Sequence, residues 1–136
     1  MVRLIMGEKG TGKTKQLIEM INAAAAEESG SVVCIEAKDT MTFDIHYHAR
    51  LISAAEYQIA SYEGLRGFVS GLYAGNYDTS HVFIDNMFKI VGGEPNQDAD
   101  NFFAWLDGFS AKNGVKFTVC VSGAPEMATD GMQKYL

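Results

Sequence analysis

The chain has 136 residues, of which 47% are hydrophobic and 21% charged, as is typical of one globular domain spanning residues 1–136. The formal net charge is -6 and no run of lysine or arginine occurs, which argues against nucleic acid or an anionic membrane as a partner. The apolar stretches are much shorter than the roughly 20 residues of a membrane-spanning helix, and no secretion signal is recognisable, so we expect a cytoplasmic protein.

The first feature along the chain is a short apolar run at residues 2–6, followed by a glycine-rich segment and a helical pattern at residues 13–26. The glycine-rich segment matches the whole G-x-x-x-x-G-K-[ST] pattern of a phosphate-binding loop. In such a loop, backbone N–H groups surround the phosphates of a nucleotide, and glycine is needed where a Cβ would obstruct them. The residues of the loop are Gly7, Glu8, Lys9, Gly10, Thr11, Gly12, Lys13 and Thr14.

Two side chains of this loop have predicted roles beyond shaping the backbone. Lys13 reaches the β- and γ-phosphates, and the Thr14 hydroxyl can ligate Mg²⁺. The helix that follows directs its N-terminal N–H groups and its dipole toward the same anion. The guanine-specifying N-K-x-D pattern is absent, since residues 113–116 read N-G-V-K, and this favours ATP as the nucleotide.

The elements that follow alternate between strands and helices. Residues 31–35 predict a buried strand, residues 36–57 fit one or two short strands or an irregular loop, and residues 62–73 predict a glycine-weakened helix capped by Ser61. Residues 81–85 predict a third strand, residues 91–98 a loop, and residues 99–112 an aromatic helix that faces the core. Residues 115–121 predict a fourth strand, and the segment from residue 125 a last helix. Gly30 and Gly114 serve as helix stop signals.

This alternation predicts an α/β fold with three α/β/α layers and a mainly parallel sheet of four to five strands. Cys34 and Cys120 each fall within an apolar strand, which favours buried thiols over a disulfide or a metal site. Ligands bind at the carboxyl ends of parallel strands, so the loop, Glu36, Asp85 and Ser122 are expected to converge there.

Residues 82–85 read V-F-I-D and match the Walker B pattern, in which the carboxylate binds Mg²⁺ directly or through water. Asp85 is therefore the second expected metal ligand beside Thr14. In ATPases that resemble RecA, a glutamate commonly follows this aspartate and activates the attacking water, whereas the next residue here is Asn86. An amide cannot accept a proton, so we expect hydrolysis to be slower by about 10²- to 10⁴-fold.

Three other residues are candidates for catalysis. Glu36 and Asp39 follow the second strand, where RecA-like ATPases can place a catalytic glutamate, or they are solvated loop acids. Ser122 occupies the position where the same branch often places a polar sensor of the γ-phosphate, or it is a turn residue.

The remaining polar candidates have simpler explanations. Arg50 or Arg66 could act as an arginine finger on a neighbouring subunit, but surface or packing roles fit them better. His46 and His48 could share a metal, but without a nearby third ligand a solvated strand face explains them better.

By these motifs and the strand order, the chain is identified as a member of the P-loop NTPase superfamily, in its RecA-like and thymidine-kinase-like branch. Residues 37–40 resemble the segment after the second strand of thymidine kinases, but Asn86 replaces their catalytic glutamate, and their zinc cysteines and carboxyl-terminal substrate lasso are missing. The chain also resembles small bacterial P-loop proteins loosely labelled as twitching-motility (PilT-like) ATPases. It is too short for a hexameric motor with an N-terminal domain.

The expected function is that of an ATP–Mg²⁺-binding protein with slow or partner-stimulated hydrolysis, acting as a nucleotide-dependent switch. A minimal nucleoside or small-molecule kinase and a non-hydrolysing interaction module are the alternatives. Beyond ATP and ADP, the sequence indicates no particular partner, and a homo-oligomer stays open.

Overall fold

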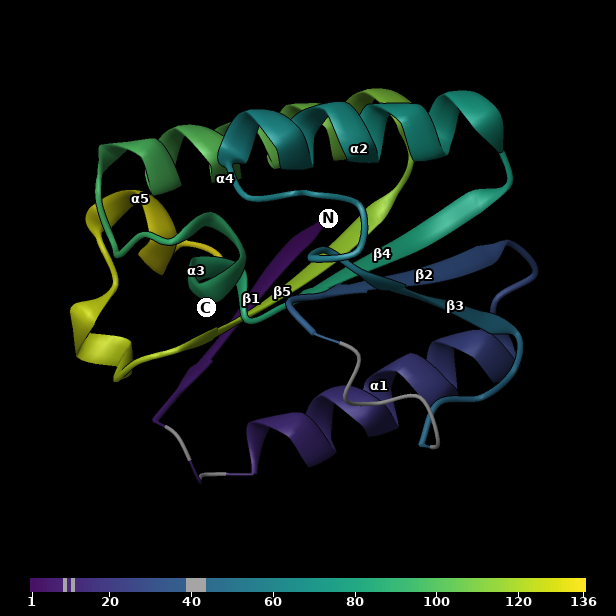
Figure 1. The fold of residues 1–136 in the computed structure, drawn as a ribbon, viewed down its shortest axis with the longest axis horizontal. Helices are drawn as coiled ribbons and strands as arrows, with labels where there is room; N and C mark the ends of the chain where they lie inside the picture. Colours follow the sequence, from purple (N-terminus) through teal and green to yellow (C-terminus); the bar gives the residue numbers. More distant parts are fainter. Residues whose placement is uncertain (9, 11, 39–43) are drawn as a thin grey trace.

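The computed structural model describes residues 1–8, 10, 12–38 and 44–136, in which a five-stranded sheet lies between helices on both faces (Figure 1). The strands are β1 (Val2–Gly7), β2 (Ser31–Glu36), β3 (Ala49–Ser53), β4 (Thr79–Asp85) and β5 (Lys116–Ser122). The helices are α1 (Lys13–Glu27), α2 (Tyr62–Gly75), α3 (Met87–Val91), α4 (Gln97–Asn113), the 3₁₀ helix η1 (Pro125–Met127) and α5 (Asp130–Gln133). None of the helices in these described ranges has the length and apolarity needed to cross a membrane.

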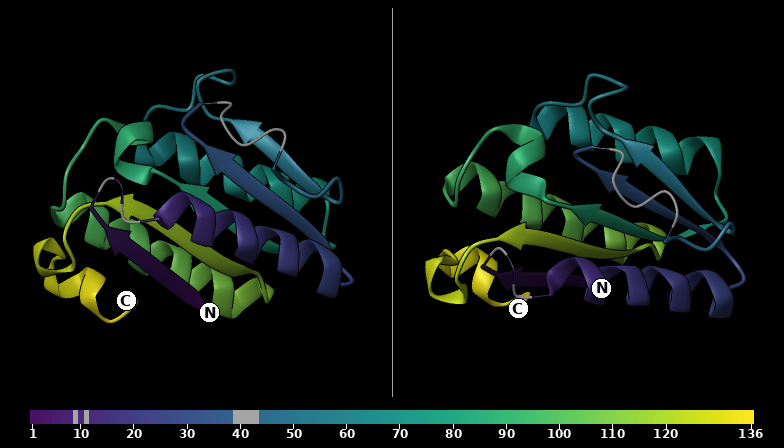
Figure 2. Two further views of the ribbon diagram at one scale, coloured as in Figure 1. Left: turned by 90° about the horizontal axis from the view of Figure 1, so that it is seen from below. Right: turned by 60° about the horizontal axis from the view of Figure 1, so that its bottom comes forward.

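The sheet has the strand order β1-β5-β4-β2-β3, and every neighbouring pair is parallel. Helix α1 covers one face, while α2 and α4 cover the other, as the views in Figure 2 show. All five strands therefore end at one edge, where the loop after β1 meets the ends of β4 and β5. The structure confirms the predicted three-layer α/β/α fold with its parallel sheet.

The core has two parts because both faces of the sheet are covered. Between the sheet and α2 and α4 lies a large cluster that includes Phe102, Phe103 and Phe117, and a smaller cluster under α1 contains Phe83. Cys34 and Cys120 belong to the smaller cluster and are free thiols, as predicted. The continuous apolar runs of the central strands match this burial on both faces.

The described residues of the region 36–57 contribute one strand, β3, which pairs in parallel with β2 at the edge of the sheet. A parallel pair requires a crossover. The described part of the connection between β2 and β3 is hydrogen-bonded to Asn22 of α1. The Asn22 Nδ2 donates to the Asp44 carbonyl at 2.9 Å, and the Asn22 Oδ1 accepts from the His46 N–H at 2.7 Å.

The other predicted elements lie close to their observed positions. Ser61 caps α2 by accepting a hydrogen bond from the Gly64 N–H at 3.0 Å, as predicted. Helix α4 begins at Gln97 because Asn96 accepts from the Ala99 N–H, so the predicted loop before it is shorter. The carboxyl-terminal segment forms η1 and α5 instead of one helix, and the short helix α3 after β4 was not predicted.

Candidate nucleotide-binding site

The glycine-rich loop connects β1 to α1 and holds two glycines in the left-handed backbone region. Gly10 has φ 89° and Gly12 has φ 83°, and side chains with a Cβ rarely adopt this conformation. Gly12 is also the N-cap of α1 and provides no side-chain hydrogen bond to the first turn. The first turn of α1 contains no acidic residue, and the N–H groups at a helix N-terminus favour an anion.

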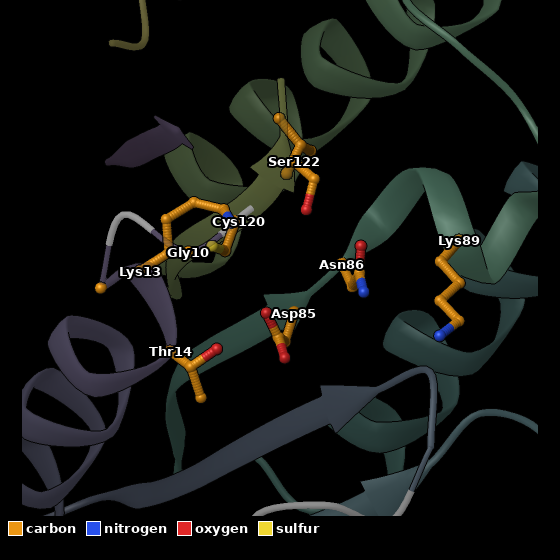
Figure 3. A pocket seen from close by; sticks show the side chains of 10 residues that line it. Gly10, Lys13, Thr14, Asp85, Asn86, Lys89, Cys120 and Ser122 are labelled. Carbon is orange, nitrogen blue, oxygen red and sulfur yellow. The ribbon is translucent and has the colours of Figure 1, made fainter. Parts of the chain in front are cut away.

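A cavity of about 570 Å³ lies between this loop and the carboxyl ends of β4 and β5. Its described lining residues are Gly10, Gly12, Lys13, Thr14, Asp85, Asn86, Lys89, Cys120, Val121 and Ser122. In Figure 3 the hydroxyl of Thr14 and the carboxylate of Asp85 point toward one another from α1 and β4. Lys13 and Lys89 also line the cavity, and in this view they lie on opposite sides of Asp85, with Asn86 between Asp85 and Lys89.

Among the described residues, six that were predicted for the site line this cavity: Gly10, Gly12, Lys13, Thr14, Asp85 and Ser122. Gly7 and Glu8 lie at the start of the loop, outside the described lining, and the Gly7 carbonyl accepts a hydrogen bond from the Gly123 N–H at 3.0 Å. Ser122 lines the cavity and is the register partner of Gly7 across β1 and β5. Lys9, Thr11 and Asp39 lie outside the described residues.

Glu36 lies one strand away from Asp85. The two residues are register partners at the carboxyl ends of β2 and β4, and Glu36 is only 1% exposed. Burial and then the nearby charge of Glu36 raise the pKa of Asp85, while Lys13, the Cys120 thiol and the Asn86 N–H oppose that rise. Glu36 is not among the described residues that line the cavity, although it is close enough to Asp85 for its charge to act on that carboxylate.

The arginines and histidines considered from the sequence lie elsewhere. Arg50 is exposed on β3 and Arg66 lies on α2, and neither belongs to the described lining of the cavity. The His46 and His48 rings contact each other, and the His46 Nδ1 accepts a hydrogen bond from the His48 N–H at 3.1 Å. Within the described ranges, no three His, Cys, Asp or Glu side chains gather as a metal-binding group.

Three of the described lining residues, Lys89, Cys120 and Val121, were not predicted from the sequence. Lys89 lies on α3, and because that helix was not predicted, nothing in the sequence indicated that a lysine four residues after Asp85 would return to the cavity. Cys120 is the register partner of Asp85 across β4 and β5. Burial and the Asp85 charge raise the pKa of the Cys120 thiol to about 12, so the thiol is neutral and shares a hydrogen bond with the carboxylate.

Asn86 is also in the left-handed region, with φ 57° and ψ 50°, and forms the N-cap of α3. Asparagine tolerates this conformation better than most residues with a Cβ. The turn that connects β4 to α3 therefore gives a structural reason for asparagine at this position.

The protein has a three-layer α/β/α fold in which the G-x-x-x-x-G-K-[ST] segment follows the first strand of the parallel sheet. No family model and no curated protein matches the sequence. Among solved structures, the flagellar accessory protein FlaH from Methanocaldococcus jannaschii has a similar fold, with a TM-score of 0.65 over 98% of this chain. The sequence identity is 14%, and this chain spans 65% of the length of the FlaH chain, so the similarity concerns the fold alone.

Proposed function

We propose that this protein binds ATP with Mg²⁺ in the cavity at the N-terminus of α1 and hydrolyses it slowly, as a nucleotide-dependent switch. The observation that carries the proposal is the meeting of the Thr14 hydroxyl and the Asp85 carboxylate across the cavity, beside the uncapped first turn of α1 (Figure 3). This arrangement puts a helix N-terminus that suits phosphate next to two side-chain oxygens that suit Mg²⁺.

The residues present fit the expected ligands. The left-handed backbone at Gly10 and Gly12 supports a loop that curls around the phosphates, and Lys13 adds a positive charge. Mg²⁺ in such sites is held by one or two protein oxygens together with phosphate oxygens and water, which Thr14 and Asp85 would provide. When bound, the ion would neutralise charge on the β- and γ-phosphates.

Slow hydrolysis is supported by the surroundings of Asp85. The neighbouring Asn86 faces the cavity but carries no group that accepts a proton. Glu36 could accept one, but it is buried and does not line the described cavity, and Ser122 offers only a hydroxyl. A long-lived ATP complex suits a protein whose output depends on which nucleotide it holds.

Isothermal titration calorimetry with ATP and ADP, with and without Mg²⁺, tests the binding step. We expect Lys13→Ala to weaken ATP binding by about tenfold or more because it removes a charge-assisted contact with the phosphates. Lys112→Ala, an exposed change on α4, serves as the matched control. Absence of ATP and ADP binding to the wild-type protein with Mg²⁺ present, or equal affinities of the Lys13→Ala and wild-type proteins, would refute the proposal.

A further inference from the structure

A second cavity, of about 310 Å³, lies at the same edge of the sheet, beside the candidate nucleotide site. It is formed by the ends of β2 and β3, the turn before α2, and α3. Its walls are largely apolar, with Ala54, Ala55 and Ile90 among the residues that line it. The charged residues that line it in the described part of the chain, Lys38 and Lys89, are both positive, in a protein of net charge -6.

The walls of this cavity are held in place by the backbone. The Ala54 N–H donates to the Glu36 carbonyl at 2.7 Å, and the Ile59 N–H donates to the Ala54 carbonyl at 2.9 Å. Gln58, in the same turn, has φ 60°, a conformation that is uncommon outside glycine and is often found at ligand-binding positions. The turn is thus attached to the end of β2 and shaped before any ligand arrives.

The size and charge of the cavity define the class of ligand. A volume of about 310 Å³ lies at the lower end of the range for small-molecule sites and suits a small metabolite. The alanines and Ile90 suit an apolar body, and the ammonium groups suit an acidic group at one end.

Lys89 also lines the first cavity, on the opposite side of Asp85 from Lys13 (Figure 3). It is exposed, so its long side chain is free to turn toward either cavity. An anion in the second cavity and the γ-phosphate of ATP would therefore attract the same ammonium group, and the two anions would repel each other.

We propose that the second cavity binds a small organic anion with an apolar body, and that this anion and the γ-phosphate of ATP weaken each other's binding through Lys89. The anion is the effector of the proposed switch, so the coupling rests on the proposed function, whereas binding of the anion itself does not. Linkage makes this effect reciprocal. If the anion binds the ADP complex more tightly than the ATP complex by a certain factor, then the anion lowers the affinity for ATP relative to ADP by the same factor.

Hexanoate and butyl phosphate are suitable probes because they share an apolar chain and differ in the acidic group. Amide chemical shifts of the ¹⁵N-labelled protein, recorded without nucleotide, locate binding independently of ATP. We expect saturable shifts at Ala54, Ala55 and Ala60, with the tighter probe revealing whether carboxylate or phosphate is preferred. Shifts confined to the loop around Gly10 and Gly12, or equal binding of the neutral hexanol, would overturn the proposal.

Two substitutions distinguish binding in this cavity from binding in the nucleotide site. Lys38→Gln removes a charge that lines only the second cavity, and Ala55→Leu fills part of it from an exposed position. Each should weaken the preferred probe about five- to tenfold while ATP affinity changes less than about twofold. Lys112→Gln and Ala104→Leu, at exposed positions on α4, are the matched controls. Unchanged probe affinity in both Lys38→Gln and Ala55→Leu would rule the site out.

The coupling is tested by titrating the preferred probe into protein loaded with ADP–Mg²⁺ and into protein loaded with a non-hydrolysable ATP analogue and Mg²⁺. We expect weaker probe binding, about threefold or more, in the ATP-analogue complex, and a smaller difference in Lys89→Gln. Equal affinities in the two complexes would overturn the coupling. Failure of both nucleotides to bind would refute the proposed function, and with it the coupling, while the nucleotide-free titration still decides whether the anion site exists.

Discussion

Glu36 and Asp85 are neighbouring carboxylates at the ends of β2 and β4, and the first is buried while the second faces the candidate nucleotide site. We expect Glu36→Gln to slow single-turnover ATP hydrolysis by about 10²-fold if Glu36 accepts the proton that Asn86 cannot. ATP affinity should change less than about threefold, because Glu36 does not line the cavity. Glu63→Gln, on the surface of α2, is the control. Equal hydrolysis rates in the wild-type and Glu36→Gln proteins would remove Glu36 as the base.

The Asp85→Asn variant tests the metal site. We expect Mg²⁺ to strengthen ATP binding in the wild-type protein and to do so about tenfold less in the variant, because a neutral amide is a poorer Mg²⁺ ligand. The pKa of Asp85 is raised by burial and by Glu36, so the ionised carboxylate is disfavoured in the folded protein. The variant should therefore be at least as stable to urea as the wild type at pH 7.

Calorimetry at several Mg²⁺ concentrations measures the metal effect, with Asp107→Asn on the exposed side of α4 as the control. A loss of stability together with a loss of affinity would indicate damage to the fold instead of a missing ligand. An unchanged Mg²⁺ effect in the stable variant would exclude Asp85 as a metal ligand.

The backbone at Asn86 leads to a prediction about stability. The left-handed conformation costs most residues with a Cβ about 1–2 kcal/mol, but asparagine less and glycine least. Asn86→Ala should thus lower the free energy of unfolding by about 1 kcal/mol, and Asn86→Gly should change it little. Urea unfolding of the three proteins without nucleotide measures this difference. Equal losses in Asn86→Ala and Asn86→Gly would mean that the asparagine side chain, and not the backbone, stabilises the turn.

The parts of the fold that the sequence predicts correctly are those with a strong local pattern. The apolar runs of β1, β2, β4 and β5 and the cap at Ser61 are local signals, and so is Gly114, which ends α4 with φ 71°. Strand β3 has no such pattern because it is a short edge strand whose position depends on pairing with β2. The convergence of Lys13, Thr14 and Asp85 was also predictable, because each follows or ends a strand of a parallel sheet and such strands end at one edge. In the structure all three line one cavity.

Other features depend on contacts between distant residues. Gly30 was predicted to end α1, but the helix ends at Glu27, and Gly30 is needed because a Cβ there would lie 2.4 Å from the Asp78 carbonyl oxygen. Lys89 reaches the cavity only because Asn86 turns the chain into α3. The burial of Glu36 likewise follows from its place between β3 and β4 in the sheet, which the sequence order does not reveal.

His81 gives a prediction about pH at the edge of the sheet opposite the cavity. Its Nδ1 lies 3.0 Å from Glu28 Oε2 and its Nε2 lies 2.8 Å from Thr118 Oγ1, in a site that also faces Lys116 and the amino terminus. Burial lowers the pKa of His81, and although Glu28 opposes this, Lys116 and the amino terminus add to it. The folded protein therefore favours the neutral ring.

A group whose pKa is depressed on folding stabilises the protein fully above its unfolded pKa and progressively less below it. The free energy of unfolding should thus fall as the pH decreases from 7 to 5, through the ordinary histidine value of 6.5. Burial acts to raise the pKa of Glu28, but hydrogen bonds from Ser80, His81 and Lys116 outweigh it and lower the pKa below its ordinary value of 4.5. Glu28 therefore adds to this loss of stability only near and below pH 4.5. Urea unfolding at pH 7, 6 and 5 should show a smaller decline in His81→Gln than in the wild type. His48→Gln, at an exposed position, should follow the wild type, and parallel curves for all three proteins would show that His81 does not control this loss.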